Sequence, residues 1–267
     1  MDFSRMKQLV VPEGNVKKIK IGGRTVWQAD TDDTPLTAAQ ISAIKAGTFE
    51  NINVGYYWTF INVPYTYLNE YNTTKSTTYS GIMRVADCDY YLNTGDIPLT
   101  THHVVVVPDT NMFNEDMNMT GTAEGGYVGS KMRTTYLRRA EAIFKACFGE
   151  NHVLSHREFL VNTINSSAEV GKREAAGAWY DSTVELMDER MVWGTAKYAN
   201  TSLPSVSNKQ LTLFKNNSAY IATDREYWLR NVHSVYSFAG VNTHGSSTVI
   251  NASPSMAIGV RPYALIY

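Results

Sequence analysis

The residues of this chain best suited to covalent chemistry are two cysteines and six histidines. Cys88 lies between Asp87 and Asp89, and nearby carboxylates raise the pKa of a thiol and oppose formation of the nucleophilic thiolate. Cys147 falls in a helical pattern, where a small buried thiol is the usual role. The sequence therefore predicts no catalytic cysteine, and one possible pair of cysteines is no disulfide framework.

The histidines do not have the spacing of a metal site. His152 and His156 lie in a segment whose pattern indicates a strand that enters a helix. On a strand these side chains share a face but are too far apart to chelate one ion. His102 and His103, as neighbours on a strand, would point to opposite faces. We expect no histidine-based metal centre.

Asp87, Asp89 and Asp96 could together bind calcium, because hard cations take carboxylates from loops. Solvated loop acids are the more common role, so we expect no metal and no other cofactor. The chain also has no Gly-x-Ser-x-Gly motif, no phosphate-binding glycine loop and no dinucleotide fingerprint. We expect a protein that is not an enzyme.

Composition excludes several classes of partner. The formal net charge is −1, and no long basic stripe is present, which argues against nucleic acid. Charged residues make up only 18% of the chain. An abundance of Tyr, Asn, Ser and Thr is typical of adhesive β-rich surfaces, and also of ordinary β-rich proteins. Without an apolar signal core or a bilayer-length apolar run, the chain is expected to be made in the cytoplasm, with no signal peptide and no membrane insertion.

The elements that must position any site begin with short strands in residues 9–27. Gly22 and Gly23 predict the two-residue turn of a β-hairpin. A hairpin of this size cannot bury a core by itself, so it must pack on the main domain or on another protein, and we favour a docking element. An acidic, polar stretch follows the hairpin. We divide the chain into an N-terminal hairpin anchor at residues 1–30, a linker at 31–37 and a ligand-binding domain at 38–267.

The main domain is predicted to open with a short helix. Thr37 is a suitable N-cap, Ile41 and Ile44 have helical spacing, and Gly47 can end the helix in a left-handed conformation. Strand-like segments follow at residues 52–61, 82–91 and 104–107.

The clearest helix is predicted at residues 131–148, with Ser130 as N-cap and Gly149 just after its end. One face of this helix carries its apolar residues, namely Met132, Tyr136, Leu137, Ala140, Ile143, Phe144 and Cys147. A second, shorter helix is predicted at residues 208–215. Two helices beside short-stranded antiparallel sheets, with the β-hairpin in front, make an α+β fold.

The most informative segment is residues 227–262. Its framework positions are Trp228, Arg230, Phe238, Val241, Gly245, Ala252 and residues 259–262. Residues 231–255 contain no Lys, Arg, Asp, Glu, Gln, Trp or Met. An uncharged surface of Tyr, Ser, Asn and Gly has the composition of a paratope.

The framework motifs resemble a known family. The runs WLR at residues 228–230, FAxVNxxG at 238–245 and GVRP at 259–262 resemble the C-terminal signature of a C-type-lectin-like family related in fold to the formylglycine-generating enzyme. A looser resemblance at residues 126–130, 154–158 and 177–181 extends over most of the domain. It implies a C-type-lectin-like domain of the kind displayed by phages and prophages.

Some members of this family resemble variable proteins of diversity-generating retroelements. In those systems, randomised adenines turn Asn codons into a subset that omits Lys, Glu, Gln, Trp and Met. Residues 231–255 are compatible with that subset. Two departures limit the resemblance. The enzyme uses cysteines in its C-terminal half, whereas this chain has none after Cys147, and the tripeptides of calcium-dependent sugar binding are absent.

We predict that Trp228, Phe238 and Val241 are core residues, and that Arg230 and Arg261 are buried partners of carboxylates. The predicted ligand-binding residues lie between them and are His233, Tyr236, Gly240, Thr243, His244, Ser246, Thr248, Val249, Ile250, Asn251 and Pro254.

The resemblance implies a phage virion protein, displayed on a tail or capsid surface, that binds a host cell-surface protein or glycan receptor. Residues 1–30 would contact other virion proteins, and the chain would form a homo-oligomer, with a trimer favoured among related display proteins. Two alternatives remain open: a virion decoration protein with purely structural contacts, and an enzyme, either of the sulfatase-modifying type or a cryptic hydrolase.

Overall fold

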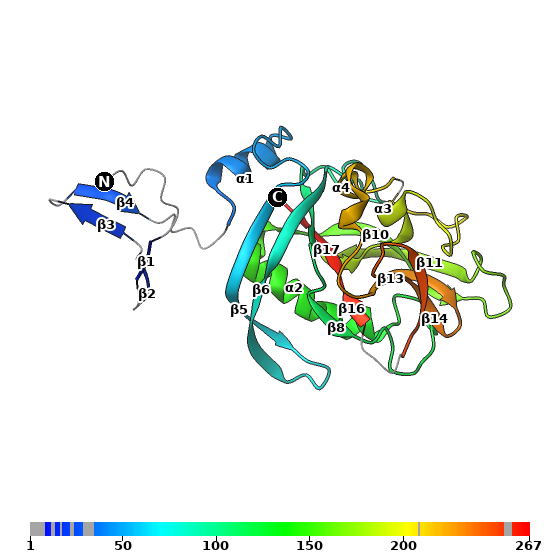
Figure 1. Ribbon diagram of the computed structural model, residues 1–267. Helices are drawn as coiled ribbons and strands as arrows, with labels where there is room; N and C mark the ends of the chain where they lie inside the picture. Colours follow the sequence, from blue (N-terminus) through cyan, green and yellow to red (C-terminus); the bar gives the residue numbers. More distant parts are fainter. Residues whose placement is uncertain are drawn as a thin grey trace.

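The computed structural model has a mixed α+β architecture with several antiparallel sheets and few helices (Figure 1). It describes the backbone of residues 9–11, 14–16, 18–21, 24–28, 35–207, 209–253 and 258–267, and side chains from residue 35 onward.

The N-terminal strands form two small antiparallel pairs. Strand β3 (Lys18–Ile21) pairs with β4 (Arg24–Gln28), which confirms the predicted hairpin. A second pair, β1 (Leu9–Val11) and β2 (Gly14–Val16), precedes it. Among the described strands these four pair only with one another. Most of the predicted linker lies outside the described residues.

Helix α1 (Ala38–Lys45) begins and ends where the sequence predicts. The Thr37 side chain accepts a hydrogen bond from the backbone N–H of Gln40, and the Gln40 side chain accepts one from the N–H of Thr37, which completes a capping box. Gly47 follows with φ +66°, and Ile44 is fully buried.

The larger sheet has the strand order β12-β17-β7-β6-β5, and β9 pairs with β17 at its side. Its strands are β5 (Tyr57–Leu68), β6 (Thr74–Cys88), β7 (Val104–Pro108), β9 (Val153–Leu154), β12 (Val184–Leu186) and β17 (Pro262–Ile266). The predicted strand at residues 104–107 is confirmed.

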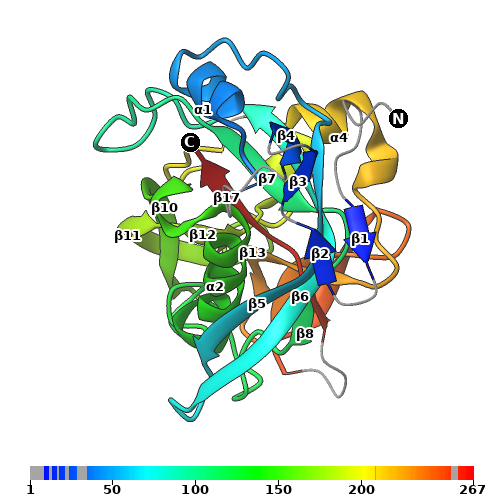
Figure 2. The same ribbon diagram turned by 90° about the vertical axis from the view of Figure 1, so that its left-hand side faces the viewer.

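The other two predicted strands are confirmed in part, over residues 57–61 and 82–88. Strand β5 starts five residues after the predicted Ile52, because a turn that includes Gly55 at φ +94° precedes it. Strands β5 and β6 then continue as a long hairpin that extends beyond the body of the domain (Figures 1 and 2). The outer part of β6 is polar and exposed, so the sequence there carries no apolar pattern from which a strand could be predicted.

The second sheet has the order β15-β14-β13-β16-β8. Its strands are β8 (Phe113–Glu115), β13 (Tyr227–Ser234), β14 (Ser237–Val241), β15 (Ser247–Asn251) and β16 (Ile258–Val260). Strands β10 (His156–Ile164) and β11 (Glu174–Ser182) form a separate antiparallel pair. His156 therefore begins a strand, and the helix expected after it is absent from residues 156–164.

The long helical segment is confirmed, with one difference. It starts as a π-helical turn (Met132–Tyr136) and continues as α2 (Leu137–Phe148). The Ser130 hydroxyl accepts a hydrogen bond from the Arg133 backbone at 3.2 Å, and Gly149 ends the helix at φ +89°. Phe148 packs edge-on against Trp58 of β5, with 4.9 Å between ring centroids.

The shorter helices differ from the prediction. The helix expected at residues 208–215 is α4 (Thr212–Asn216), which starts later, and Asn208 lies outside the described residues. It starts at Thr212 because the distant Asp87 carboxylate accepts hydrogen bonds from the backbone and hydroxyl of Thr212, at 2.9 and 2.8 Å. Helix α3 (Glu189–Trp193), with Asp188 as N-cap, was not predicted.

A buried charge cluster joins the sheets. Arg230 of β13 lies 3.2 Å from the Glu158 carboxylate and 3.4 Å from that of Asp188, so its predicted role is confirmed. The Tyr263 hydroxyl of β17 also donates to Glu158. Burial by itself raises the pKa of the Glu158 carboxyl, but Arg230 and hydrogen bonds from His156 and Tyr263 lower it to about 2.

The prediction for Arg261 was wrong about its partners. Its guanidinium is buried but donates to three backbone carbonyls, those of Pro108, Tyr220 and Ile221, at 2.8, 2.9 and 3.0 Å. These carbonyls lie where β7 ends and where a short 3₁₀ turn (Ser218–Tyr220) ends, so they lack strand partners.

The Glu158→Gln variant tests the charge cluster. Loss of one partner from a buried ion pair should lower the free energy of unfolding by about 3–5 kcal/mol at pH 7. The folded pKa lies below the ordinary value of 4.5, so the stabilisation is present above pH 4.5 and is lost as the pH falls towards 2. The difference from wild type, measured by denaturant unfolding, should therefore shrink in acid. Glu124→Gln, at an exposed position, is the control; an equally small loss in both variants would contradict the prediction.

Candidate ligand-binding face

The structure divides the predicted binding residues between two turns. His233 and Tyr236 lie at the turn from β13 to β14, and Thr243, His244 and Ser246 lie at the turn from β14 to β15. Consecutive turns of an antiparallel meander lie at opposite ends of its strands. The predicted set is therefore two groups of residues, one at each end of the meander.

Of the remaining predicted residues, Gly240 lies on β14, and Thr248, Val249, Ile250 and Asn251 lie on β15, the edge strand of this sheet. Val249 and Asn251 are exposed and Thr248 is half-buried. Gly240 and Ile250 are buried and face each other, since a Cβ on Gly240 would lie 2.3 Å from the Ile250 side chain. These two residues pack the sheet and do not reach the surface. Pro254 lies outside the described residues.

The framework beneath the turns is fully buried, as predicted. Trp228, Phe238 and Val241 have no exposed surface. The Trp228 indole N–H also donates to the Glu115 carbonyl of β8 at 2.8 Å, which ties β13 to the far edge of its sheet. The exposed turns are therefore mounted on strands that cannot shift without opening the core.

The turn from β14 to β15 is held by its own hydrogen bonds. The Asn242 side-chain oxygen accepts from the backbone N–H groups of His244 and Ser246, both at 3.0 Å. Gly245 has φ +78°, a conformation that favours glycine. The Trp193 indole donates to the Gly245 carbonyl at 3.1 Å, which fixes the turn to α3.

A pocket of about 440 Å³ lies between this turn and α3, within the range of roughly 300–1,000 Å³ that is typical of small-ligand sites. Its lining consists of Trp193, Thr195, Lys197, Ser218, Ile221, His244, Gly245, Ser246 and Ser247. Sequence reasoning found His244 and Ser246 but missed Trp193, Lys197 and the others. Those residues belong to no motif, and only the fold brings them to the turn.

Two buried carboxylates hold the loop that follows α3. One Glu189 oxygen accepts the backbone N–H groups of Lys197, Tyr198 and Ala199, at 3.0, 2.8 and 3.0 Å. Glu174 of β11 accepts the backbone N–H groups of Asn200 and of Val232 in β13, at 3.0 and 2.9 Å.

Burial raises the pKa of both carboxyls, that of Glu174 to about 7. The two acids fix the loop at residues 194–200 against the meander.

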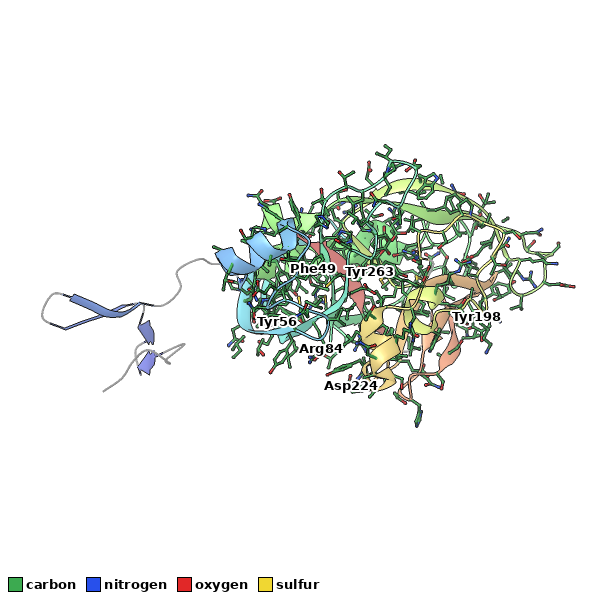
Figure 3. The ribbon with its side chains drawn as sticks, turned by 90° about the horizontal axis from the view of Figure 1, so that it is seen from above. Phe49, Tyr56, Arg84, Tyr198, Asp224 and Tyr263 are labelled. Atoms are coloured by element: carbon green, nitrogen blue, oxygen red, sulfur yellow. The ribbon has the colours of Figure 1, made fainter. Side chains whose placement is uncertain are left out.

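The loop at residues 194–200 also contacts His233, one of the predicted binding residues at the turn from β13 to β14. Tyr198, labelled in Figure 3, lies in this loop. The Lys197 ammonium lies 5.0 Å from the Tyr198 ring centroid, and the Tyr198 ring meets the His233 imidazole edge-on at 4.8 Å. Burial, together with the positive charges of Arg173 and Lys197, lowers the pKa of His233. Residues 193–198 thus connect the two turns into one face, which we call the meander face.

The acidic residues considered for calcium have separate partners. Asp87 accepts from Thr212, Asp89 from His102 at 2.6 Å, and Asp96 from Arg157 at 2.8 Å. No group of three or more metal-ligating side chains occurs among the described residues.

The structure also shows the surroundings of the two histidine pairs and of Cys88. His152 contacts the Tyr267 carbonyl, whereas His156 lies beside Glu158, so the two have different surroundings. His103 is buried and His102 is partly exposed. Burial raises the pKa of the Cys88 thiol to about 12, and Asp87 and Asp89 add to this. No described helix is long and apolar enough to cross a membrane.

A second surface is apolar. Five exposed large hydrophobic side chains are spread along β5 and the adjoining turns, namely Tyr56, Tyr57, Ile61, Leu68 and Tyr71. Strand β5 is the edge of the larger sheet and contains no charged residue. Edge strands are usually protected by charges, proline or bulges, and β5 has Pro64 and a bulge between Phe60 and Val63, so another chain would contact its exposed side chains.

Substitutions at buried framework residues and at turn residues should differ in their effect on the free energy of unfolding. Trp228→Ala should cost about 3–5 kcal/mol, because it empties a fully buried site. Exchanging Thr243, His244, Ser246 or Thr248 for other small polar residues should stay within about 0.5 kcal/mol. Denaturant unfolding measures both, and equal losses at the two kinds of position would contradict the division.

In comparisons with known proteins, no family model matches this chain, and neither a curated protein nor a solved structure gives a significant match.

Proposed function

We propose that this chain is a non-enzymatic phage display protein that binds a host cell-surface ligand through the meander face. The observation that carries the proposal is the contrast within residues 227–251. Exposed, uncharged turn residues stand on strand residues that are fully buried. Binding residues on loops held by a rigid scaffold are the common arrangement of recognition sites.

The resemblance of the framework motifs supports the same proposal. A C-type-lectin-like domain with variable turns needs a core that does not depend on the turn residues. Here the core contacts of β13 and β14 come from Trp228, Phe238 and Val241, all outside the two turns. Sequence changes at Thr243 or His244 would then alter the ligand and leave the fold intact, as a diversified protein requires.

A binding role also fits the chemistry of the cysteines. The pKa of Cys88 and that of Cys147 are both raised to about 12 by burial, so neither thiol ionises readily near neutral pH. This argues against a thiol-dependent enzyme of the sulfatase-modifying type. The competing hypothesis is a virion decoration protein with only structural contacts. An adsorption experiment distinguishes that hypothesis from a receptor-binding display protein.

The N-terminal strands would serve as the anchor to other virion proteins. Strands β1 to β4 pair only among themselves within the described chain. Isolated two-stranded hairpins are marginally stable in water, so a partner surface would stabilise them. Residues 38–267 would then project the meander face away from the virion.

Adsorption of the phage to host cells tests the proposal. Purified full-length protein, added to cells beforehand, should reduce adsorption by occupying the receptor. Protein without residues 1–30 should reduce it equally but should not assemble into virions, because the anchor is missing. If neither protein reduces adsorption while the full chain still assembles, the decoration reading is correct.

We further propose that the chain forms a homo-oligomer, with a trimer as the favoured state, through the edge of β5. Ile61 is 74% exposed on this strand, and Ile97, in a loop elsewhere, is 67% exposed. Light scattering after size-exclusion chromatography should give an oligomer for wild type and for Ile97→Lys, but a smaller species for Ile61→Lys, since a charge at a packed edge opposes pairing. An oligomer of unchanged mass in Ile61→Lys would contradict this contact.

A further inference from the structure

The pocket beside the turn from β14 to β15 has unused hydrogen-bonding groups. Thr195, Ser218 and Ser246 line it, and their hydroxyls make no hydrogen bond to a described residue. Thr195, Ser218 and Ser246 are exposed residues, so their hydroxyls are accessible to a ligand and can both donate and accept hydrogen bonds. The Ser247 hydroxyl also lacks a partner among the described residues, but it is inaccessible to solvent and therefore out of reach of a ligand.

The charged groups that line the pocket are all of one sign, which is positive. Lys197 is its one charged lining residue, and no carboxylate lines it. Lys197 forms no ion pair with any residue in the described part of the chain. The buried carboxyls of Glu189 and Glu174 are hydrogen-bonded to this loop but do not line the pocket. The Lys197 ammonium is therefore the one charged group that the pocket lining offers to an anion.

The apolar part of the lining limits the shape of the ligand. Trp193 is half-buried, and its indole N–H is already bonded to Gly245, so only its ring surface is free for contact. Ile221 lies beside it. An aromatic ring and an aliphatic side chain together offer a surface for the C–H groups of a ring-shaped ligand.

We propose that this pocket binds an acidic saccharide, with its carboxylate on Lys197, its hydroxyls on the Ser and Thr hydroxyls, and a ring face on Trp193. This assignment rests on the proposed function and names its ligand class. Saccharide hydroxyls both donate and accept, as Ser and Thr hydroxyls do, so each can find a partner here. A peptide, by contrast, would pair with the backbone of the exposed edge strand β15.

Titration calorimetry with the full-length protein tests the assignment. The probes are digalacturonate with its neutral methyl ester, and 3′-sialyllactose with lactose, so that uronic and sialic acids are distinguished. One acidic probe should bind about tenfold more tightly than its neutral partner, because the carboxylate forms a charge-assisted hydrogen bond. Raising the salt concentration should weaken that binding.

Variants of Lys197 test whether the acidic probe binds in this pocket. Lys197→Gln should weaken the acidic probe about tenfold and leave the neutral one unchanged, and Lys197→Arg should retain binding. Lys215→Gln, at an exposed position on α4, is the matched control and should bind like wild type. Thermal unfolding of each variant shows whether a loss of binding reflects misfolding. If Lys197→Gln is misfolded, binding of the acidic probe to Lys197→Arg decides whether a positive charge at this position is sufficient.

The outcomes separate this assignment from the proposed function. If the protein blocks adsorption but neither acidic probe binds, or if an acidic peptide binds in their place, the saccharide assignment is wrong and the display function stands. If an acidic probe binds with the predicted dependence on Lys197 but adsorption is unaffected, the pocket is a saccharide site and the receptor role is wrong.

Discussion

The burial of Arg230 is the constraint on which the rest of this structure depends. The Arg230 side chain is buried, and Glu158 of β10 and Asp188 before α3 supply anionic partners for its guanidinium. The ladder between β13 and β14 is irregular between Trp228 and Val232, which is where Arg230 lies. One side chain thus fixes β13 relative to β10 and to the start of α3. The position of the meander face follows from that arrangement.

Buried charged side chains also fix the loop that follows α3, which lies at the surface. Asp188 binds Arg230 and also caps α3, so the cluster sets where the helix begins. Glu189, the next residue, then gathers three backbone amides of the loop, and Glu174 fastens the loop to β13. Charges inside the protein therefore determine the shape of an outer face that carries almost no charge of its own.

Much of the framework could be predicted from the sequence. The Thr37 cap and Gly47 mark α1, and the apolar face of residues 131–148 marks the long helix, because capping and 3.6-residue periodicity are local properties. The burial of Trp228, Phe238 and Val241 was also predictable, since large apolar residues in an uncharged segment belong to a core. The outer part of β6 was not, because its exposed residues have no such pattern.

The site was only half determined by the sequence. Residues such as His244 and Ser246 could be chosen from composition, because an uncharged run of small polar residues indicates a binding surface. Composition could not show that Gly240 and Ile250 face inward or that the meander separates His233 from His244, since strand pairing decides both. Trp193 and Lys197 reach the pocket only because Glu189 and Glu174 fold their loop onto β13, a long-range contact that no local pattern records.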